Sequence, residues 1–242
     1  HCGTCHTPRA PTMQEKGLTA ADAQFLAGGA VLDGWIAQSL RSEGAGGLGS
    51  WSEQDIVDLL KTGRNTHSSV FGSMAEVVRH STQYMRETDL RAIAAYLKAL
   101  PAKTAAPEYV YDGAVGQALW RGDDRLRGAA LYVDSCAACH RTDGKGYEQV
   151  FPALAGNSTV LAPDAHNLIA LILNGHRVPA TAERPSTFTM PAFGWRLSDA
   201  QVADVASFVR SSWGNGAGVV GTRQVAGLRA AAARHAVPAR QP

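Results

Sequence analysis

The sequence predicts an all-α protein in which one small domain occurs twice in tandem. A shift of 112 residues places the apolar residues of segment 56–63 on those of 168–175, and those of 90–97 on those of 202–209. Within each segment the apolar residues recur with the spacing of one face of an amphipathic helix. A repeat of this length indicates two copies of one domain, because the repeats of a solenoid are much shorter.

The first repeated helix of each copy carries local signals for its ends. In the first copy, Ser52 and Asp55 form a capping-box pattern at the start, and Gly63 closes the helix. Gly175 stands at the corresponding place in the second copy. The matched positions are Ile56, Leu59, Leu60 and Gly63 in the first copy, and Leu168, Leu171, Ile172 and Gly175 in the second.

The second repeated helix is marked in the same way. In the second copy, Ser198 and Gln201 form the capping pattern, and Trp213 with Gly214 is expected to end the helix. The matched apolar positions are Leu90, Ile93 and Leu97 in the first copy, and Val202, Val205 and Val209 in the second.

All four cysteines lie in two copies of the pattern C-x-x-C-H, at residues 2–6 and 136–140. This pattern is the attachment site of haem c. Its two thiols form thioethers with the two vinyl groups of one porphyrin, and the adjacent histidine binds the iron. The sequence therefore predicts two covalent haems c. The predicted thioether ligands are Cys2, Cys5, Cys136 and Cys139, and the predicted proximal iron ligands are His6 and His140.

Other uses of the cysteines explain the pattern less well. The two pairs lie too far apart in sequence for a zinc ribbon, and both carry the additional histidine. A thioredoxin-like redox motif would stand beside a βαβ pattern, which the sequence does not show. Structural disulfides would leave both histidines unexplained.

A haem that only transfers electrons is usually six-coordinate, and methionine is a common second axial ligand. Met190 is the single methionine of the second copy and is its predicted sixth ligand. In the first copy Met74 is preferred, because it lies near the position that the repeat gives for Met190. It also follows Phe71, as Met190 follows Phe188.

Four other residues of the first copy remain alternatives for that ligand. Met85 borders the second repeated helix, where core packing is the ordinary role of methionine. Met13 follows the haem motif so closely that ligation would need an unusual loop. His67 or His80 would give bis-histidine ligation and a lower potential, although such histidines are more often surface residues or neighbours of a haem propionate.

Three segments lie outside the repeat. Residues 101–126 have no clear periodicity and are predicted to form a linker. The first copy has an insertion before its first repeated helix, and its glycine-rich residues 44–49 are expected to form an exposed loop near the haem. Residues 225–235 are expected to form either a short basic helix suited to a membrane or partner, or a frayed tail. The tryptophans considered for the haem crevices, or for ordinary core packing, are Trp35, Trp51 and Trp195.

The composition is that of an ordinary globular protein, with 45% hydrophobic and 18% charged residues among 242. The formal net charge of +2 gives no indication of nucleic-acid binding. No apolar run is long enough to span a bilayer. Because haem thioethers normally form outside the cytoplasm, we expect a leader ahead of this sequence. We also expect an upstream helix, since residues 127–133 provide Cys136 with a lead-in that Cys2 lacks.

Beyond the haem motifs, several stretches of the chain are distinctive as a set: 1–9, 47–52, 61–65, 71–78, 80–84, 136–147 and 151–157. Together they resemble the cytochrome c subunit of bacterial membrane-bound dehydrogenases that oxidise alcohol, gluconate, fructose, glucose or aldehydes. The resemblance covers about residues 1–230. Within it, residues 151–156 resemble the proline turn of class I cytochromes, whose backbone carbonyl accepts a hydrogen bond from the proximal histidine.

The resemblance implies two all-α class I cytochrome c domains, at residues 1–101 and 127–214, with a linker at 102–126 and a tail at 215–242. That family usually carries three haems, and the motifs here resemble its second and third, so a third haem is expected on an upstream domain. The family's subunit takes electrons from a flavin, quinone or molybdenum catalytic subunit. It passes them to ubiquinone or a terminal acceptor at the periplasmic face of the inner membrane, where it is bound peripherally.

Two other functions are alternatives to that of an electron-transfer subunit. A free dihaem carrier between respiratory complexes would show a complete lead-in helix before each haem and a strongly charged docking face. A dihaem peroxidase would need an iron with an open site, which a methionine in each copy argues against. We expect no catalytic nucleophile or general base in this chain, because electron transfer requires neither.

Overall fold

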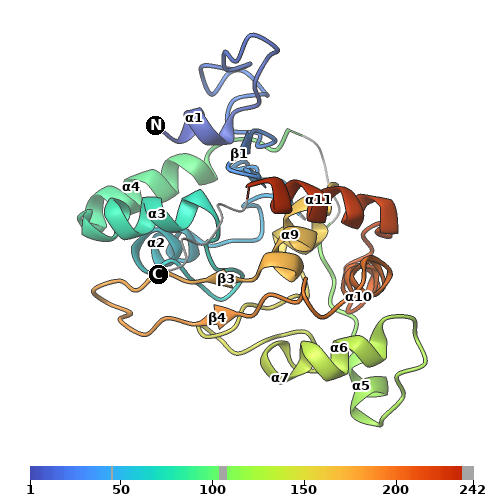
Figure 1. The fold of residues 1–242 in the computed structure, drawn as a ribbon. Helices are drawn as coiled ribbons and strands as arrows, with labels where there is room; N and C mark the ends of the chain where they lie inside the picture. The colour runs from blue at the N-terminus through green and yellow to red at the C-terminus, as the bar shows by residue number, and fades with distance from the viewer. Residues whose placement is uncertain (45, 104–107, 236–242) are drawn as a thin grey trace, which may run out of the picture.

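The computed structural model describes residues 1–44, 46–103 and 108–235, and it is mostly helical. Helices α2, α3 and α4 of the first half lie together on one side of the molecule, and α9, α10 and α11 lie together on the other (Figure 1). The first half contains α1 (Cys2–His6), β1 (Val31–Leu32), β2 (Trp35–Ile36), α2 (Glu53–Thr62), α3 (Ser73–His80), the 3₁₀ helix η1 (Thr82–Tyr84) and α4 (Glu87–Lys98). The second half contains α5 (Ala114–Trp120), α6 (Ala129–Ser135), α7 (Ala137–His140), α8 (Ser158–Leu161), α9 (His166–Asn174), β3 (His176–Arg177), β4 (Thr189–Met190), α10 (Asp199–Ser211) and α11 (Thr222–His235).

The four repeated helices are present where the sequence predicts them. In the first half α2 packs on α4, and in the second half α9 packs on α10. Their apolar faces lie in separate clusters of buried residues. One cluster contains Ile56, Leu90 and Leu97, and the other contains Ile169 and Val202. The helical part of the predicted fold class is therefore confirmed, and two short antiparallel strand pairs are added to it.

Both predicted capping boxes are formed. Ser52 Oγ accepts a hydrogen bond from the backbone N–H of Asp55 at 3.1 Å, while the Asp55 carboxylate accepts one from the Ser52 N–H at 2.8 Å. Ser198 and Gln201 make the same reciprocal pair at the start of α10. Gly63 ends α2 in the left-handed conformation, with φ of 78°, which glycine adopts without the strain of a Cβ atom. All of these signals act over a few residues, which is why the sequence alone predicts them.

The segment predicted to be a linker contains a helix. α5 packs against the second core through Leu119, which is only 7% exposed. Gly116 lies against the backbone of Asp143, where a Cβ atom would come within 2.9 Å. A helix of seven residues has too few apolar positions to show a period, so the prediction missed it.

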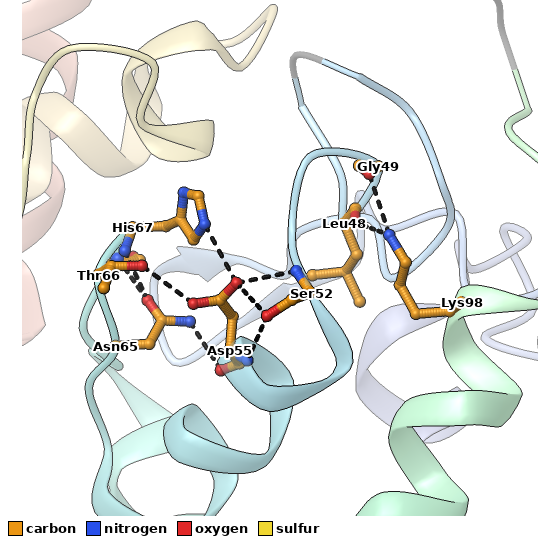
Figure 2. Close-up of polar contacts among 9 residues, drawn as sticks. Leu48, Gly49, Ser52, Asp55, Asn65, Thr66, His67 and Lys98 are labelled. Atoms are coloured by element: carbon orange, nitrogen blue, oxygen red, sulfur yellow. Dashed lines mark hydrogen bonds and ion pairs between the residues drawn. The ribbon is translucent and has the colours of Figure 1, made fainter.

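The described part of the glycine-rich segment, residues 44 and 46–49, is not the exposed loop that we expected. Gly47 and Leu48 are buried, and the ammonium group of Lys98 donates to the carbonyls of Leu48 and Gly49 at 3.0 Å each (Figure 2). A Cβ atom at Gly47 would collide with the carbonyl of Arg41. The glycines here allow close backbone packing rather than mobility.

The C-terminal segment forms the helix α11, which packs on α9 and α10. Val225 is fully buried, and Arg229 pairs with Asp199 at 2.6 Å and donates to the Leu197 carbonyl at 2.8 Å. A frayed tail is therefore wrong for the described residues, whereas a membrane or partner contact of this helix stays a prediction. None of the helices in the described ranges is long and apolar enough to cross a membrane.

Candidate haem-binding sites

Both C-x-x-C-H motifs lie on short helices that place their cysteines one turn apart. α1 carries Cys2 and Cys5, and Cys136 caps α7, which contains Cys139. Residues three apart on a helix share a face, so the two thiols of each motif can reach one ligand. The four cysteines form no disulfide with one another.

The second motif is fixed from both sides. Its N-terminal side is held by the buried Tyr132, whose carbonyl accepts from the N–H of Cys136 at 2.8 Å. The Tyr132 hydroxyl donates to the carbonyl of Arg141 at 2.6 Å. Trp213 Nε1 donates to the carbonyl of Thr142 at 3.0 Å, and the rings of Tyr132 and Trp213 pack 5.2 Å apart. These contacts hold the backbone on each side of the motif.

His140 is oriented by a single hydrogen bond. Its Nδ1 lies 2.9 Å from the carbonyl oxygen of Pro152. A carbonyl only accepts, so Nδ1 carries the proton and Nε2 keeps the lone pair that binds a metal. The predicted proline turn therefore performs the expected role.

His6 has the same arrangement, but a different part of the chain provides it. Its Nδ1 lies 2.7 Å from the carbonyl oxygen of Gln38, in the insertion of the first copy. Sequence reasoning missed Gln38, because the contact joins segments 32 residues apart in the chain. Burial lowers the pKa of both His6 and His140 below the usual value, against the opposing effect of the carbonyl bonds. Both rings are consequently neutral near pH 7, which is the state that ligates iron.

The segment that presents Gln38 is held by the second copy. Asn167, on α9, accepts from the N–H of Ile36 at 2.9 Å and donates to its carbonyl at 2.7 Å. Gln38 itself donates to the hydroxyl of Thr159 at 2.5 Å and accepts from that of Ser158 at 3.2 Å. The carbonyl that orients His6 thus depends on helices α8 and α9, more than 100 residues away in sequence.

Met190 lies on β4, directly opposite His176 of β3. It is partly buried and packs against the second core. Met74 lies in the first turn of α3, is also partly buried, and packs beside Val70 and Val78. Both methionines stay predictions as sixth ligands.

Three of the alternative ligands in the first copy are engaged in other contacts. Met85 packs into the core between α2 and α4, and its carbonyl accepts from Lys61 at 3.0 Å. His67 stacks on the buried Trp51 and lies 3.3 Å from the Asp55 carboxylate (Figure 2). His80 is exposed and pairs with Glu76 at 3.0 Å on the same helix.

The remaining candidates are also placed by the structure. Met13 is 70% exposed. Among the tryptophans considered for haem crevices, Trp195 is 84% exposed, whereas Trp35 packs against Phe71 with ring centroids 5.2 Å apart.

The donor sets fit covalent haem and do not fit the competing chemistries. Burial, followed by the neighbouring Cys139 and Asp134, raises the pKa of Cys136 to about 12, so this thiol is not the activated thiolate of a redox motif. In the described residues no three His, Cys, Asp or Glu side chains come together as a metal cluster, so the two pairs do not converge on one zinc ion. What the motifs present is a pair of thiols beside a partly buried, neutral imidazole with a free Nε2.

Comparison with known proteins agrees with this chemistry. The family model described as "Cytochrome c" matches residues 126–213. The chain is 33% identical over 79 residues to cytochrome c-554(548) of Halomonas halodenitrificans, and this match covers 86% of that protein and 33% of the chain. The chain belongs to the cytochrome c family. Its helical second copy, with α6, α7 and α10, is the part that the family model matches.

Longer relatives match almost the whole chain. It is 49% identical over 234 residues to the gluconate 2-dehydrogenase cytochrome c subunit of Pantoea cypripedii, covering 95% of the chain and 53% of the relative. It is 47% identical over 232 residues to the cytochrome c subunit of a quinone-type alcohol dehydrogenase of Gluconobacter oxydans, covering 95% and 48%. The chain therefore spans about half the length of these relatives, and the resemblance to cytochrome c subunits of dehydrogenases is confirmed.

Replacing Met190 by alanine tests the sixth ligand of the second copy. We expect Met190→Ala to make one haem high-spin and to lower its midpoint potential, because methionine opposite histidine stabilises the reduced iron. Optical spectra and a spectroelectrochemical titration of the chain with its haems attached measure both effects. An unchanged spectrum and midpoint would remove Met190 from the site.

The pair Met74→Ala and Met85→Ala tests the first copy. We expect Met74→Ala to produce a high-spin haem while the fold persists. Met85→Ala should leave the spectrum unchanged but reduce the free energy of unfolding by about 2 kcal/mol, since it removes core packing. The opposite pattern, with the spectral change in Met85→Ala, would reverse the ligand assignment.

Proposed function

We propose that this chain is an electron-transfer subunit carrying two haems c, which relays electrons from a partner dehydrogenase to membrane ubiquinone or a terminal acceptor. The observation that carries the proposal is the pair of C-x-x-C-H helices, each with its histidine oriented through Nδ1 by a backbone carbonyl. The relatives support it, because they are cytochrome c subunits of gluconate and alcohol dehydrogenases.

The protein contributes to this function by fixing the orientation of the histidines that would bind the haem iron. A bound haem c supplies a one-electron iron couple. The carbonyls of Gln38 and Pro152 hold the proton on Nδ1 and keep Nε2 free for the iron. Tyr132 and Trp213 fix the backbone on either side of His140, so that the proximal ligand does not have to move when the charge changes.

The partner is proposed to be a catalytic subunit of flavin, quinone or molybdenum type. A third haem is proposed on an upstream domain, as in the family that the sequence resembles. The proposed location is the periplasmic face of the bacterial inner membrane with peripheral attachment, because haem thioethers normally form outside the cytoplasm.

Isolation of the native complex tests this proposal. We expect mild detergent extraction of membranes to yield the chain in a stoichiometric complex with a dehydrogenase subunit. We also expect gluconate, an alcohol or fructose to reduce its haems in that complex. A chain recovered alone and soluble, with both haems low-spin and no reduction by any of these substrates, would contradict the proposal and favour a free dihaem carrier. A matched control is the complex with its dehydrogenase subunit inactivated. In this control dithionite should still reduce the haems, whereas none of the substrates should.

A further inference from the structure

In the described part of the chain three arginines are buried, and two of them have backbone partners on both Nε and Nη1. Arg41 and Arg210 each donate three hydrogen bonds to backbone carbonyls. Those of Arg41 go to Asp22, Phe25 and Pro101, and those of Arg210 go to Val160, Ala162 and Gly218. Buried polar groups are almost always paired, and these two arginines follow that rule because their guanidinium groups donate to backbone carbonyls.

Arg64 differs from both, although it is only 5% exposed. Its one hydrogen bond runs from Nη2 to the carbonyl of Ser186 at 3.0 Å, and its Nε and Nη1 have no partner. No carboxylate in the described part of the chain forms an ion pair with it, and the charged group acting on it is a second cation, Arg184. An arginine keeps its charge, so a buried guanidinium with free donors on two edges calls for an anion.

Arg64 lies close to the segment of the second copy that carries Met190. Its guanidinium lies over the ring of Phe188, 5.1 Å from the ring centre. Phe188 precedes Met190 by two residues, so the two side chains stand on the same face of the extended segment. Arg64 therefore reaches from the first copy to the face of the second copy that carries the predicted iron ligand.

A second orphaned group lies at the same junction. Nε2 of His176 is buried without a partner, and apart from those of Arg64 it is the only such side-chain atom in the described residues. His176 stands opposite Met190 in the strand pair, so the two side chains lie on the same face, and the ring of His176 packs edge-on against Phe71 of the first copy with ring centroids 6.5 Å apart. The repeat relates the two residues, because Arg64 follows Gly63 as His176 follows Gly175.

From this arrangement we infer that Arg64 holds a haem propionate at the junction between the two copies, donating to the carboxylate through its free Nε or Nη1. The inference rests on the proposed function insofar as it requires bound haem. A haem carboxylate suits the site because the haem that carries it binds inside the protein and brings the anion with it. The planar carboxylate also matches the geometry of the guanidinium group. The carboxylate comes from the haem of the first or the second copy, and the experiment distinguishes them.

Removal of the positive charge is the first test. We expect Arg64→Gln in the chain with both haems to lower the midpoint potential of one haem, because an uncompensated carboxylate stabilises the ferric iron. Arg64→Lys keeps the charge and should restore part of the shift. If Arg64→Gln lowers the same midpoint potential that Met190→Ala lowers, the carboxylate belongs to the haem of the second copy. If it lowers the other midpoint potential, the carboxylate belongs to the haem of the first copy.

The matched control lies on the same strand pair. Arg177 is exposed, is adjacent to His176, and donates to Thr187. Arg177→Gln removes the same charge close by, but in water, where screening reduces its effect on the haem. Its midpoints should equal those of the unaltered chain.

A second measurement does not depend on Arg64→Gln folding correctly. Haem labelled with ¹³C at the propionate carboxyl groups should shift carboxylate bands in the redox difference infrared spectrum, and Arg64→Lys should move those same bands. If Arg64→Gln shifts no midpoint beyond Arg177→Gln and Arg64→Lys leaves the labelled bands unchanged, the inference is overturned while the proposed function stands. A chain that carries no covalent haem at all would overturn both.

Discussion

The hydrogen bond from Nδ1 of each motif histidine to a backbone carbonyl is the interaction on which the two sites depend. It fixes the ring, places the proton on one nitrogen and leaves the other free. Without it a partly buried, neutral imidazole could take either tautomer, and Nε2 would not be reserved for the iron. In the second copy the carbonyl belongs to Pro152, and in the first copy it belongs to Gln38.

The two copies support this hydrogen bond in different ways, and in the first copy the support comes from residues of the second copy. The Pro152 carbonyl lies 12 residues from His140, within a turn of the second copy itself. The Gln38 carbonyl is presented by a segment that Asn167 and Thr159 hold from the second copy. Arg64 reaches in the opposite direction, from the first copy to Ser186. The copies are therefore mutually dependent parts of one structure, as the proposed function requires if two haems are to stay at a fixed separation.

The features that could be predicted from the sequence are those written in short stretches of chain. The capping boxes at Ser52 and Ser198, the closing glycine at position 63 and the proline turn near Pro152 all act over a few residues. Gln38 and Asn167 could not be found, because their roles come from contacts between distant segments. The burial of Gly47 and Leu48 could not be predicted either, since it depends on packing against Arg41 and Lys98.

The most direct test of this account is an NMR measurement on the reduced chain with both haems and ¹⁵N-labelled histidine. We expect two histidine Nδ1–H protons that exchange slowly with water, one for His6 and one for His140. Asn167→Ala should speed exchange at His6 alone, because Asn167 holds only the segment that carries Gln38. Rapid exchange at both histidines in the unaltered chain, or an equal effect of Asn167→Ala on the two, would contradict the central role given to these carbonyl bonds.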